Sequence, residues 1–416
     1  MNKNTAPVVT SLLPIMAVVF IAYLVIGVAM PALPLHVHQG LGLSAFVVGL
    51  VSGSQFAASL LSRMWAGYYT DSKGAKRAVV TGVFVAAISG TLYLLSIRFV
   101  GKPVTSVAIL LSGRALLGVA ESFIMTGALS WGLAIMGPQN TGKVMAWVGT
   151  ALYAALAVGA PIGATLYSGH GFAAIALTAI LIPLGALPLV APLRPIAPPP
   201  IQERAAFSSV ARAVWTPGLT MALSGICFGA FTTFIVLLFA QQGWSPSWLA
   251  FTVFSATFIA GRLVFGHLPD KLGGARVALV CMLIEAIGQA LIWLAPSYAF
   301  ALVGVTLTGL GYSLVYPGLG VEVIRRAPPQ RRGLAMGAYT AFIDLSLGFG
   351  NPALGLVAEK AGLNAVFLVS ALAALCATVI AMRLLNATSR PSCFDDAIGL
   401  RDLQEGQYPE KLESGL

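Results

Sequence analysis

Long apolar stretches separated by short polar segments run along almost the whole chain. Twelve of them carry almost no charge and are bounded by glycine, proline or charged residues. A helix of about 20 apolar residues crosses the hydrocarbon core of a bilayer, so each stretch predicts a membrane-spanning helix. The alternation of apolar and polar residues that is typical of barrel strands is absent. The predicted helices cover residues 12–34, 46–66, 78–97, 106–130, 144–166, 172–192, 215–239, 248–266, 277–295, 299–322, 333–357 and 363–385.

The composition also indicates a membrane protein. Apolar residues make up 58% of the chain, and only 38 of its 416 residues are charged, namely 24 Lys and Arg and 14 Asp and Glu. A soluble protein carries charge on about a quarter of its residues. The charged surface is therefore too small to cover a water-soluble fold, which excludes a cytosolic enzyme or a secreted domain.

The basic residues gather on one side of the predicted membrane. If the N-terminus is inside, 20 of the 24 Lys and Arg lie on or near the cytoplasmic side, three lie on the opposite side, and Arg114 lies within a helix. The positive-inside rule therefore predicts that both termini are cytoplasmic. This placement explains the net charge of +10 without nucleic acid as a partner.

A proline-rich segment divides the predicted helices into two sets of six. The segment from Pro192 to Pro200 holds five prolines, which prevent a continuous helix and favour an extended connector. The division predicts an N-terminal six-helix bundle over 1–192, a cytoplasmic linker over 193–214, a C-terminal six-helix bundle over 215–385 and a cytoplasmic tail over 386–416.

The two sets of helices contain an internal repeat. Gly67, Asp71, Gly74 and Arg77 recur as Gly266, Asp270, Gly273 and Arg276 at an offset of 199 residues, and Arg63 recurs as Arg262. Pro138, Gln139, Gly142, Gly159 and Pro161 recur at an offset of 191. A shorter loop near Ser297 accounts for the difference between the two offsets. The repeat predicts a duplicated six-helix unit.

The repeated segment resembles the main signature of the major facilitator superfamily. Its pattern is Gly-x-x-x-Asp-x-x-Gly-x-Lys/Arg-Arg after the second helix, and it is echoed after the eighth. Arg114-x-x-x-Gly118 resembles the second motif of that superfamily, and the segment from Gly159 to Ala164 resembles the third, which is associated with exporters. Within the superfamily the chain is similar to bacterial inner-membrane carriers grouped with sugar or arabinose efflux permeases. The resemblance implies an all-α membrane protein with twelve transmembrane helices in two pseudo-symmetric six-helix bundles.

Ionisable residues at membrane depth are the strongest candidates for chemistry. Arg114 and Glu121 fall on one stripe of the fourth helix, and Asp344 falls on a stripe of small and polar residues in the eleventh. Such residues are costly in lipid and face a cavity or one another. Burial favours the protonated form of a carboxyl, whereas a neighbouring guanidinium favours the ionised form. We interpret Asp344, Glu121 and Arg114 as proton-coupling candidates. The alternatives are permanent buried contacts for the two carboxyls and, for Arg114, either neutralisation of Glu121 or binding of an anionic substrate group.

Four other polar residues have structural interpretations. Glu285 and Gln289 lie in the ninth helix, which the resemblance makes peripheral, so hydrogen bonding between helices is expected there. Arg63 and Arg262 are expected to extend to the cytoplasmic surface. Their shared place in the repeat also allows a role in gating.

Aromatic and amide side chains offer a wall for a substrate. Tyr312 and Tyr316 are one helical turn apart and can stack on a ligand or hydrogen-bond it. A packing role is the alternative for each residue. The resemblance puts the central cavity at four of these side chains, and the substrate-cavity candidates are Tyr23, Gln55, Tyr312, Tyr316 and Asn351.

The repeated segments after the second and eighth helices are interpreted as gate elements. Their glycines allow tight turns and close helix approach, and Asp71 can pair with basic residues or face a helix N-terminus of the other bundle. Such contacts bias one state of alternating access. The alternative is a solvated turn. The gating candidates are Gly67, Asp71, Gly74, Arg77, Gly266, Asp270, Gly273 and Arg276.

These features predict a secondary-active transporter of the bacterial inner membrane. The sequence has neither a phosphate-binding glycine loop nor a catalytic or metal-binding constellation, so we expect no enzymatic activity, no metal and no cofactor, with a proton gradient as the energy source. The expected partners are a small-molecule substrate and the lipid bilayer, and the expected state is a monomer. The small residues and proline of the fifth helix favour export of a sugar or drug-like solute in exchange for protons. The alternatives are a proton-coupled uptake symporter, a membrane sensor that does not transport, and a membrane-embedded enzyme.

Overall fold

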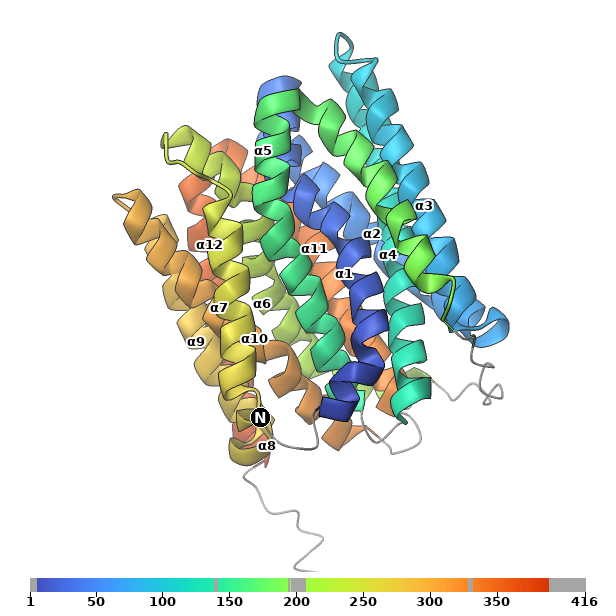
Figure 1. Ribbon diagram of the computed structural model, residues 1–416. Coiled ribbons are helices and arrows are strands. Elements are labelled where there is room, and N and C mark those ends of the chain that lie inside the picture. Colours follow the sequence, from blue (N-terminus) through green and yellow to red (C-terminus); the bar gives the residue numbers. More distant parts are fainter. Residues whose placement is uncertain (1–5, 138–140, 194, 196–206, 328–331, 389–416) are drawn as a thin grey trace, which may run out of the picture.

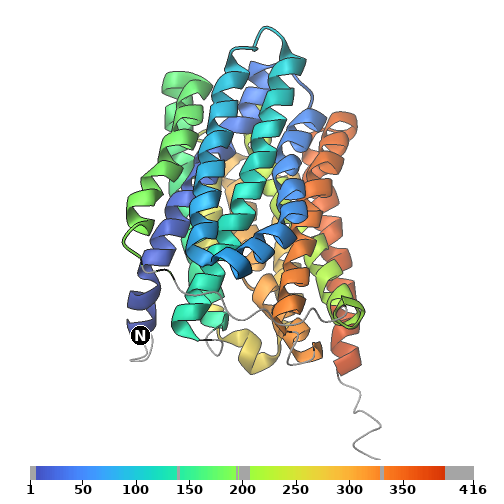
Figure 2. The same cartoon turned by 90° about the vertical axis from the view of Figure 1, so that its right-hand side faces the viewer.

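The computed structural model of the protein describes residues 6–137, 141–193, 195, 207–327 and 332–388. Within these ranges the secondary structure is helical, with short turns and no strands. The long helices run side by side along one direction (Figures 1 and 2). The helices are α1 (Ala6–Leu35), η1 (His36–Gly40, a π-helix), α2 (Ala45–Lys73), α3 (Ala75–Ile97), α4 (Pro103–Met136), α5 (Thr141–Val190), α6 (Phe207–Gln241), α7 (Leu249–Phe265), α8 (Leu268–Leu272), α9 (Gly274–Trp293), α10 (Tyr298–Arg326), α11 (Arg332–Ala361) and α12 (Leu363–Thr388).

Each of the twelve predicted spans coincides with helical residues, which confirms the all-α membrane fold. Two spans lie within α5, where the backbone leaves helical geometry at Gly171 with φ of 67°. Glycine adopts this conformation without the steric cost of a Cβ, so the chain can turn between the two spans. Ten of the described helices are long and apolar enough to cross a membrane, and α7 is a shorter apolar helix of 17 residues.

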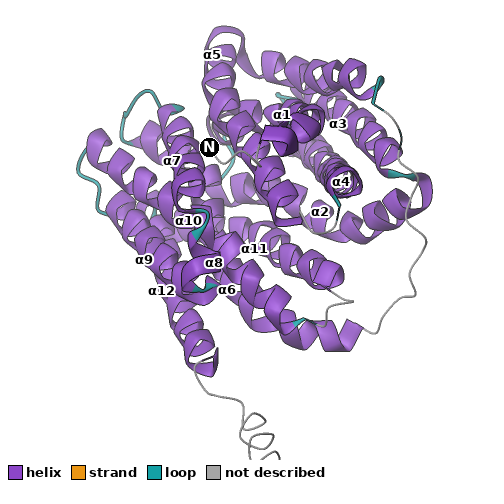
Figure 3. Ribbon diagram, turned by 60° about the horizontal axis from the view of Figure 1, so that its bottom comes forward, coloured by secondary structure: helices purple, strands orange, loops and turns teal. Residues whose placement is uncertain are grey.

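The helices form two groups, which meet along two seams. We call α1–α5 the N-terminal half and α6–α12 the C-terminal half, and they occupy opposite sides of the molecule (Figure 3). Within the first, α1 packs against α5 and α4 packs against α2 and α3; within the second, α9 packs against α10 and α12. Between the halves, α2 packs against α11 and α5 packs against α7. In the predicted linker over 193–214, residues 194 and 196–206 lie outside the described residues, and α6 begins inside the linker at Phe207. The predicted tail beyond residue 388 also lies outside the described residues.

The internal repeat is visible in the helix packing. A Cβ on Gly118 of α4 would collide with the backbone carbonyl of Gln55 in α2. A Cβ on Gly309 of α10 would lie 2.5 Å from the backbone carbonyl of Phe254 in α7. The offset of 191 maps Gly118 onto Gly309, and the offset of 199 maps Gln55 onto Phe254. The same close approach of two helices at a glycine therefore occurs in both halves.

The two gate segments differ from the simple turns that the sequence predicts. After Gly67, α2 remains helical to Lys73, and the turn is confined to Gly74, whose φ is 91°. In the second copy, α7 ends at Phe265, the short helix α8 follows, and Gly273 has φ of 92°. Both turning glycines adopt the left-handed region that favours glycine. The repeat thus places equivalent turns at Gly74 and Gly273, although the residues before them are largely helical.

Candidate functional site

Two predicted cavity residues meet around one predicted coupling carboxyl in the N-terminal half. Glu121 of α4 accepts a hydrogen bond from Gln55 Nε2 of α2 at 2.7 Å and another from the Tyr23 hydroxyl of α1 at 3.4 Å. Gln55 and Tyr23 are buried, whereas Glu121 is partly exposed. No basic group of the described residues forms an ion pair with Glu121. The carboxyl is therefore held in place by neutral donors.

An ion pair crosses the seam between α2 and α11. Arg63 donates from Nε to Asp344 Oδ2 at 2.9 Å, and its Nη2 donates to the same oxygen. The expectation that Arg63 extends to the surface is wrong. A carboxylate of the other half lies within its reach, and leaving that buried carboxylate unpaired would be costly. The alternative role of Arg63, a contact that gates the two halves, matches this geometry.

Hydrogen bonds connect this ion pair to the helix that carries Glu121. The Ser59 hydroxyl of α2 lies 3.5 Å from Asp344 Oδ2 and 3.1 Å from the Ser122 hydroxyl. Ser122, the residue after Glu121 in α4, donates to the Ser59 carbonyl at 2.8 Å. The two predicted coupling carboxyls thus lie in two neighbouring hydrogen-bonded groups that share α2 and α4. We call them together the N-side polar cluster: Tyr23, Gln55, Ser59, Arg63, Glu121, Ser122 and Asp344.

The third coupling candidate, Arg114, forms its hydrogen bond with α3 and not with Glu121. Its Nη1 donates to the Tyr93 hydroxyl of α3 at 3.4 Å, and its buried Nε has no partner among the described residues. Arg114 and Glu121 share a helix stripe but form no ion pair. Arg114 therefore does not neutralise Glu121 through an ion pair in this structure. Binding of an anionic substrate group by Arg114 stays a prediction.

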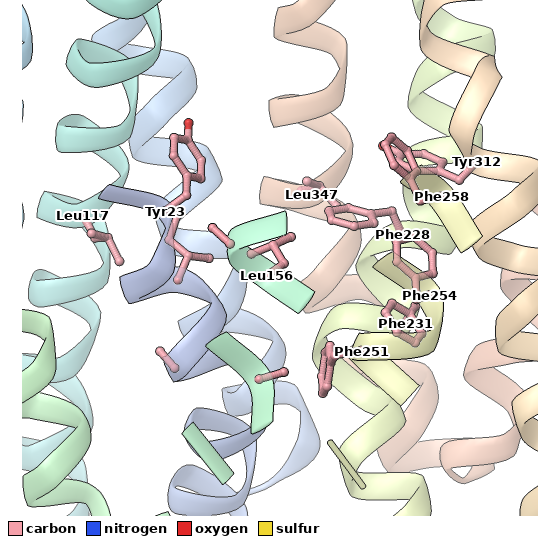
Figure 4. Close-up of a cluster of buried hydrophobic side chains, with 14 of the residues drawn as sticks. Tyr23, Leu117, Leu156, Phe228, Phe231, Phe251, Phe254, Phe258, Tyr312 and Leu347 are labelled. Carbon is pink, nitrogen blue, oxygen red and sulfur yellow. The ribbon is translucent and has the colours of Figure 1, made fainter. Parts of the chain in front are cut away.

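The equivalent positions of the C-terminal half are aromatic. The two offsets map Glu121 onto Tyr312, Gln55 onto Phe254 and Ser59 onto Phe258. Tyr312 of α10 stacks on Phe228 of α6 at 5.1 Å between ring centroids. Figure 4 shows these rings gathered on one side of the interface, with Tyr23 on the other. The structure thus places Tyr312 within a buried aromatic cluster, which we call the C-side aromatic cluster: Phe228, Phe254, Phe258 and Tyr312.

The other two cavity candidates lie on or beside α11. The Tyr316 hydroxyl is 2.9 Å from the Thr340 hydroxyl, and the Tyr316 ring stacks on Tyr339 at 5.1 Å. Asn351 is buried where Gly49 of α2 approaches α11, and its side-chain amide has no hydrogen-bond partner within the described part of the chain. Tyr316 is partly exposed and can meet a ligand, whereas Asn351 lies in the α2–α11 seam.

The seam between α5 and α7 also contains an arginine, but this one forms no ion pair with an acidic residue of the described chain. Arg262 is the repeat equivalent of Arg63, and its guanidinium carbon lies 5.6 Å from the centre of the Phe258 ring. The offset of 191 maps Asp344 onto Tyr153 of α5, whose ring stacks on Phe258 at 3.7 Å. Residue-by-residue reading of the sequence misses Tyr153. Applying the two offsets to each candidate would have found it.

Glu285 belongs to a separate cluster within the C-terminal half. It is fully buried and accepts a hydrogen bond from the Ser224 hydroxyl of α6 at 2.6 Å. Gln289 Nε2 donates to the Cys227 carbonyl of α6 at 3.4 Å. The expectation that α9 forms hydrogen bonds to a neighbouring helix is confirmed.

The gate carboxylates are solvent-exposed. Asp71 and Asp270 form no ion pair with any described residue, so the predicted pairing of Asp71 stays a prediction. Lys76 beside the first gate turn donates from Nζ to the carbonyls of Ala191 and Leu193, at 2.7 Å each. These contacts attach the turn to the end of α5.

Comparison with known proteins identifies a family pattern along most of the chain. The sequence profile described as Major Facilitator Superfamily (MFS) matches residues 15–273 and 218–397. An MFS-type transporter of Salmonella typhimurium (strain LT2) is 42% identical over 376 residues, which are 90% of this chain and 97% of that protein. The MFS-type transporter YhhS of Escherichia coli (strain K12) is 40% identical over 352 residues, which are 85% of this chain and 87% of that protein.

Solved structures share the fold at low sequence identity. A D-xylose-proton symporter aligns with a TM-score of 0.73 at 13% identity, over 89% of this chain and 97% of that one. The nucleoside transporter NupG aligns with a TM-score of 0.71 at 14% identity, over 90% of this chain and 99% of that one. At this identity the likeness concerns the fold alone.

Proposed function

The chain belongs to the Major Facilitator Superfamily, a family of transmembrane transporters, and from this premise we propose that it exports a small organic solute in exchange for protons. The observation that carries the proposal is the N-side polar cluster. In it, two membrane-depth carboxyls, Glu121 and Asp344, lie in adjoining hydrogen-bonded groups that α2 links at the seam between the halves. The proposed setting is the bacterial inner membrane, with both termini in the cytoplasm.

The Arg63–Asp344 pair supports coupling because its two members belong to different halves. While α2 and α11 are in contact, the guanidinium neutralises the Asp344 carboxylate. When the halves separate, Asp344 loses that partner, and an unpaired carboxylate at membrane depth is costly. Proton uptake by Asp344 removes this cost. Protonation therefore favours the separated state, and deprotonation favours the closed seam.

Glu121 supports a second step within the same N-side polar cluster. Its carboxyl is partly exposed and is held by Gln55 and Tyr23, which can donate to it in either protonation state. We assign Glu121 to proton loading on the side of the substrate site. Asp344 is then ionised and paired with Arg63 while the seam is closed, and it takes up a proton when the seam separates.

The packing of α2 on α11 supports an alternating-access state. Between them, Gly53 contacts Gly348, and Gly355 contacts Ala45 near the start of α2. Together with the Arg63–Asp344 pair, these contacts run along α2 from its first residue to Arg63. We propose that this structure is the state in which the molecule is closed at the end opposite Asp71.

The packing of α5 on α1 supports export. A Cβ on Gly159 would lie 2.7 Å from the Gly27 carbonyl carbon, and a Cβ on Gly163 would collide with the Val28 carbonyl. Such close contact between two helices can seal the N-terminal half against proton leakage while solute is exchanged.

Transport in membrane vesicles of both orientations tests the proposal. Everted vesicles that contain the protein and have an acidic interior are given a panel of sugars, organic acids and drug-like compounds. We expect at least one solute to accumulate inside and to dissipate the pH gradient when added. Accumulation only in right-side-out vesicles, with protons entering alongside, would instead show a symporter. Vesicles that contain the Glu121→Gln, Asp344→Asn double variant are the matched control.

A further inference from the structure

The two arginines related by the repeat stand in opposite situations. Arg63 pairs with Asp344 across the α2–α11 seam, whereas Arg262 has no acidic partner within the described residues of the α5–α7 seam or elsewhere among them. We propose that Arg262 binds the anionic group of the transported solute, so that the substrates are organic anions. This inference rests on the proposed transport function and assigns a substrate class to its site.

The repeat explains why Arg262 is unpaired. The position equivalent to Asp344 is Tyr153, so the acid that neutralises Arg63 has no counterpart at the second seam. Arg262 lies in the last turn of α7, and a partly buried guanidinium without a carboxylate partner is costly unless it serves a function. Arg262 also remains partly exposed, which keeps its guanidinium available to a ligand.

The surroundings of Arg262 fit an anion with an apolar body. An ideal Cβ on Gly149 of α5 would lie only 3.0 Å from Arg262 Nη1, so the glycine leaves room for the guanidinium to reach the other half. The Tyr316 hydroxyl lies within electrostatic range of both Arg262 and Arg63. The partly exposed rings of Tyr153 and Tyr316 offer flat apolar surfaces nearby. A guanidinium binds a carboxylate or phosphate through two parallel hydrogen bonds.

The acids of the N-side polar cluster do not compete for Arg262. Asp344 is bound to Arg63, and Glu121 is bound to Gln55 and Tyr23. An arriving anion therefore finds Arg262 as a cation without an internal counter-charge. A cationic solute would instead require Glu121 as its partner, and this is the competing outcome of the test.

Three probes of one size and shape separate these outcomes. Benzoate, benzamide and benzamidine carry negative, zero and positive charge on the same ring. Binding to the detergent-purified full chain is measured by the shift in its unfolding temperature. We expect benzoate to raise that temperature more than benzamide or benzamidine. The proposal is overturned if benzoate raises the unfolding temperature no more than benzamidine does, or does not raise it at all.

Substitutions of Arg262 and its neighbours test whether benzoate binds at Arg262. Arg262→Gln should weaken benzoate binding about tenfold or more, because a charge-assisted contact is lost. Arg98→Gln removes an exposed arginine on the turn after α3 and should leave benzoate binding unchanged. If Arg262→Gln does not fold, Tyr153→Asp serves instead. It gives Arg262 an internal carboxylate that competes with benzoate, and Tyr153→Asn is its control.

Benzoate binding that persists in Arg262→Gln or in Tyr153→Asp would also overturn the proposal. This binding is measured without a membrane or a pH gradient. A loss of the predicted charge preference therefore refutes the substrate class, whereas a failure of vesicle transport refutes the proposed function.

Discussion

The two halves share a helix scaffold but carry opposite chemistry at equivalent positions. In the N-terminal half, Gln55 and Glu121 form a hydrogen-bonded polar site. Their equivalents in the C-terminal half, Phe254 and Tyr312, belong to a buried aromatic cluster. The glycine contacts that position α4 on α2 and α10 on α7 are nevertheless the same. The two halves therefore share the packing of the unit and differ in its inner surface.

The seams between the halves show the same contrast. One is closed by the Arg63–Asp344 ion pair, and the other places Arg262 among the rings of Phe258 and Tyr153. A structure with two ionic seams would respond to protons at both. In the proposed mechanism, protonation acts on the ionic α2–α11 contact and leaves the guanidinium of the aromatic seam for solute.

The largest expected effect comes from removing one member of the ionic seam. Arg63→Ala or Asp344→Ala leaves a charge unpaired in a largely buried position and should lower the free energy of unfolding by about 3–5 kcal/mol. Arg262→Ala loses only a cation–π contact and should cost about 1–2 kcal/mol. Thermal unfolding of the detergent-purified variants measures both.

The double variant Arg63→Met, Asp344→Leu is the control, because it leaves neither charge behind. It should recover most of the stability that each alanine variant loses. Equal losses at Arg63 and Arg262 would contradict the asymmetry of the two seams.

A smaller effect is expected at the shared glycine contacts. Gly118→Ala and Gly309→Ala each place a Cβ against a backbone carbonyl and should cost about 1–3 kcal/mol, by similar amounts in the two halves. Gly185→Ala is the control, since a Cβ there would meet no atom within 4 Å. Destabilisation by only one of the two substitutions would show that the halves do not share this packing.

The smallest effects are expected for the donors to Glu121. Gln55→Met removes the 2.7 Å hydrogen bond while keeping the length of the side chain, and should cost on the order of 1 kcal/mol. Tyr23→Phe removes the longer contact of 3.4 Å and should cost less. The reverse order, measured by the same unfolding assay, would mean that Tyr23 is the main donor to Glu121.

Much of this architecture follows from the sequence, because the cost of polar backbone and side chains in lipid acts on each segment separately. Apolar length alone places the twelve spans, and the rarity of polar residues within them identifies Glu121 and Asp344. The partners of those residues depend on which helices touch. The sequence favours the surface for Arg63, because only the packing of α2 on α11 brings Asp344 within its reach. The single helical turn of α8 depends on local backbone geometry that hydropathy does not report.

The central claim, that protonation of Asp344 separates the α2–α11 seam, can be tested without a substrate. Thr105 near the start of α4 and Phe300 near the start of α10 are exposed and lie in different halves. Thr105 follows α3 in the chain and Phe300 follows α9, and each of these helices begins at a gate turn. Both residues therefore lie at the end of the molecule opposite Asp71.

Spin labels at Thr105 and Phe300, on a background without the four native cysteines, report the distance between the halves by pulsed electron paramagnetic resonance. We expect a shorter distance at neutral pH, a growing population of a longer distance as the pH falls, and the longer distance at every pH in Asp344→Asn. A distance distribution in Asp344→Asn that matches the unsubstituted protein, with the same response to pH, would contradict it.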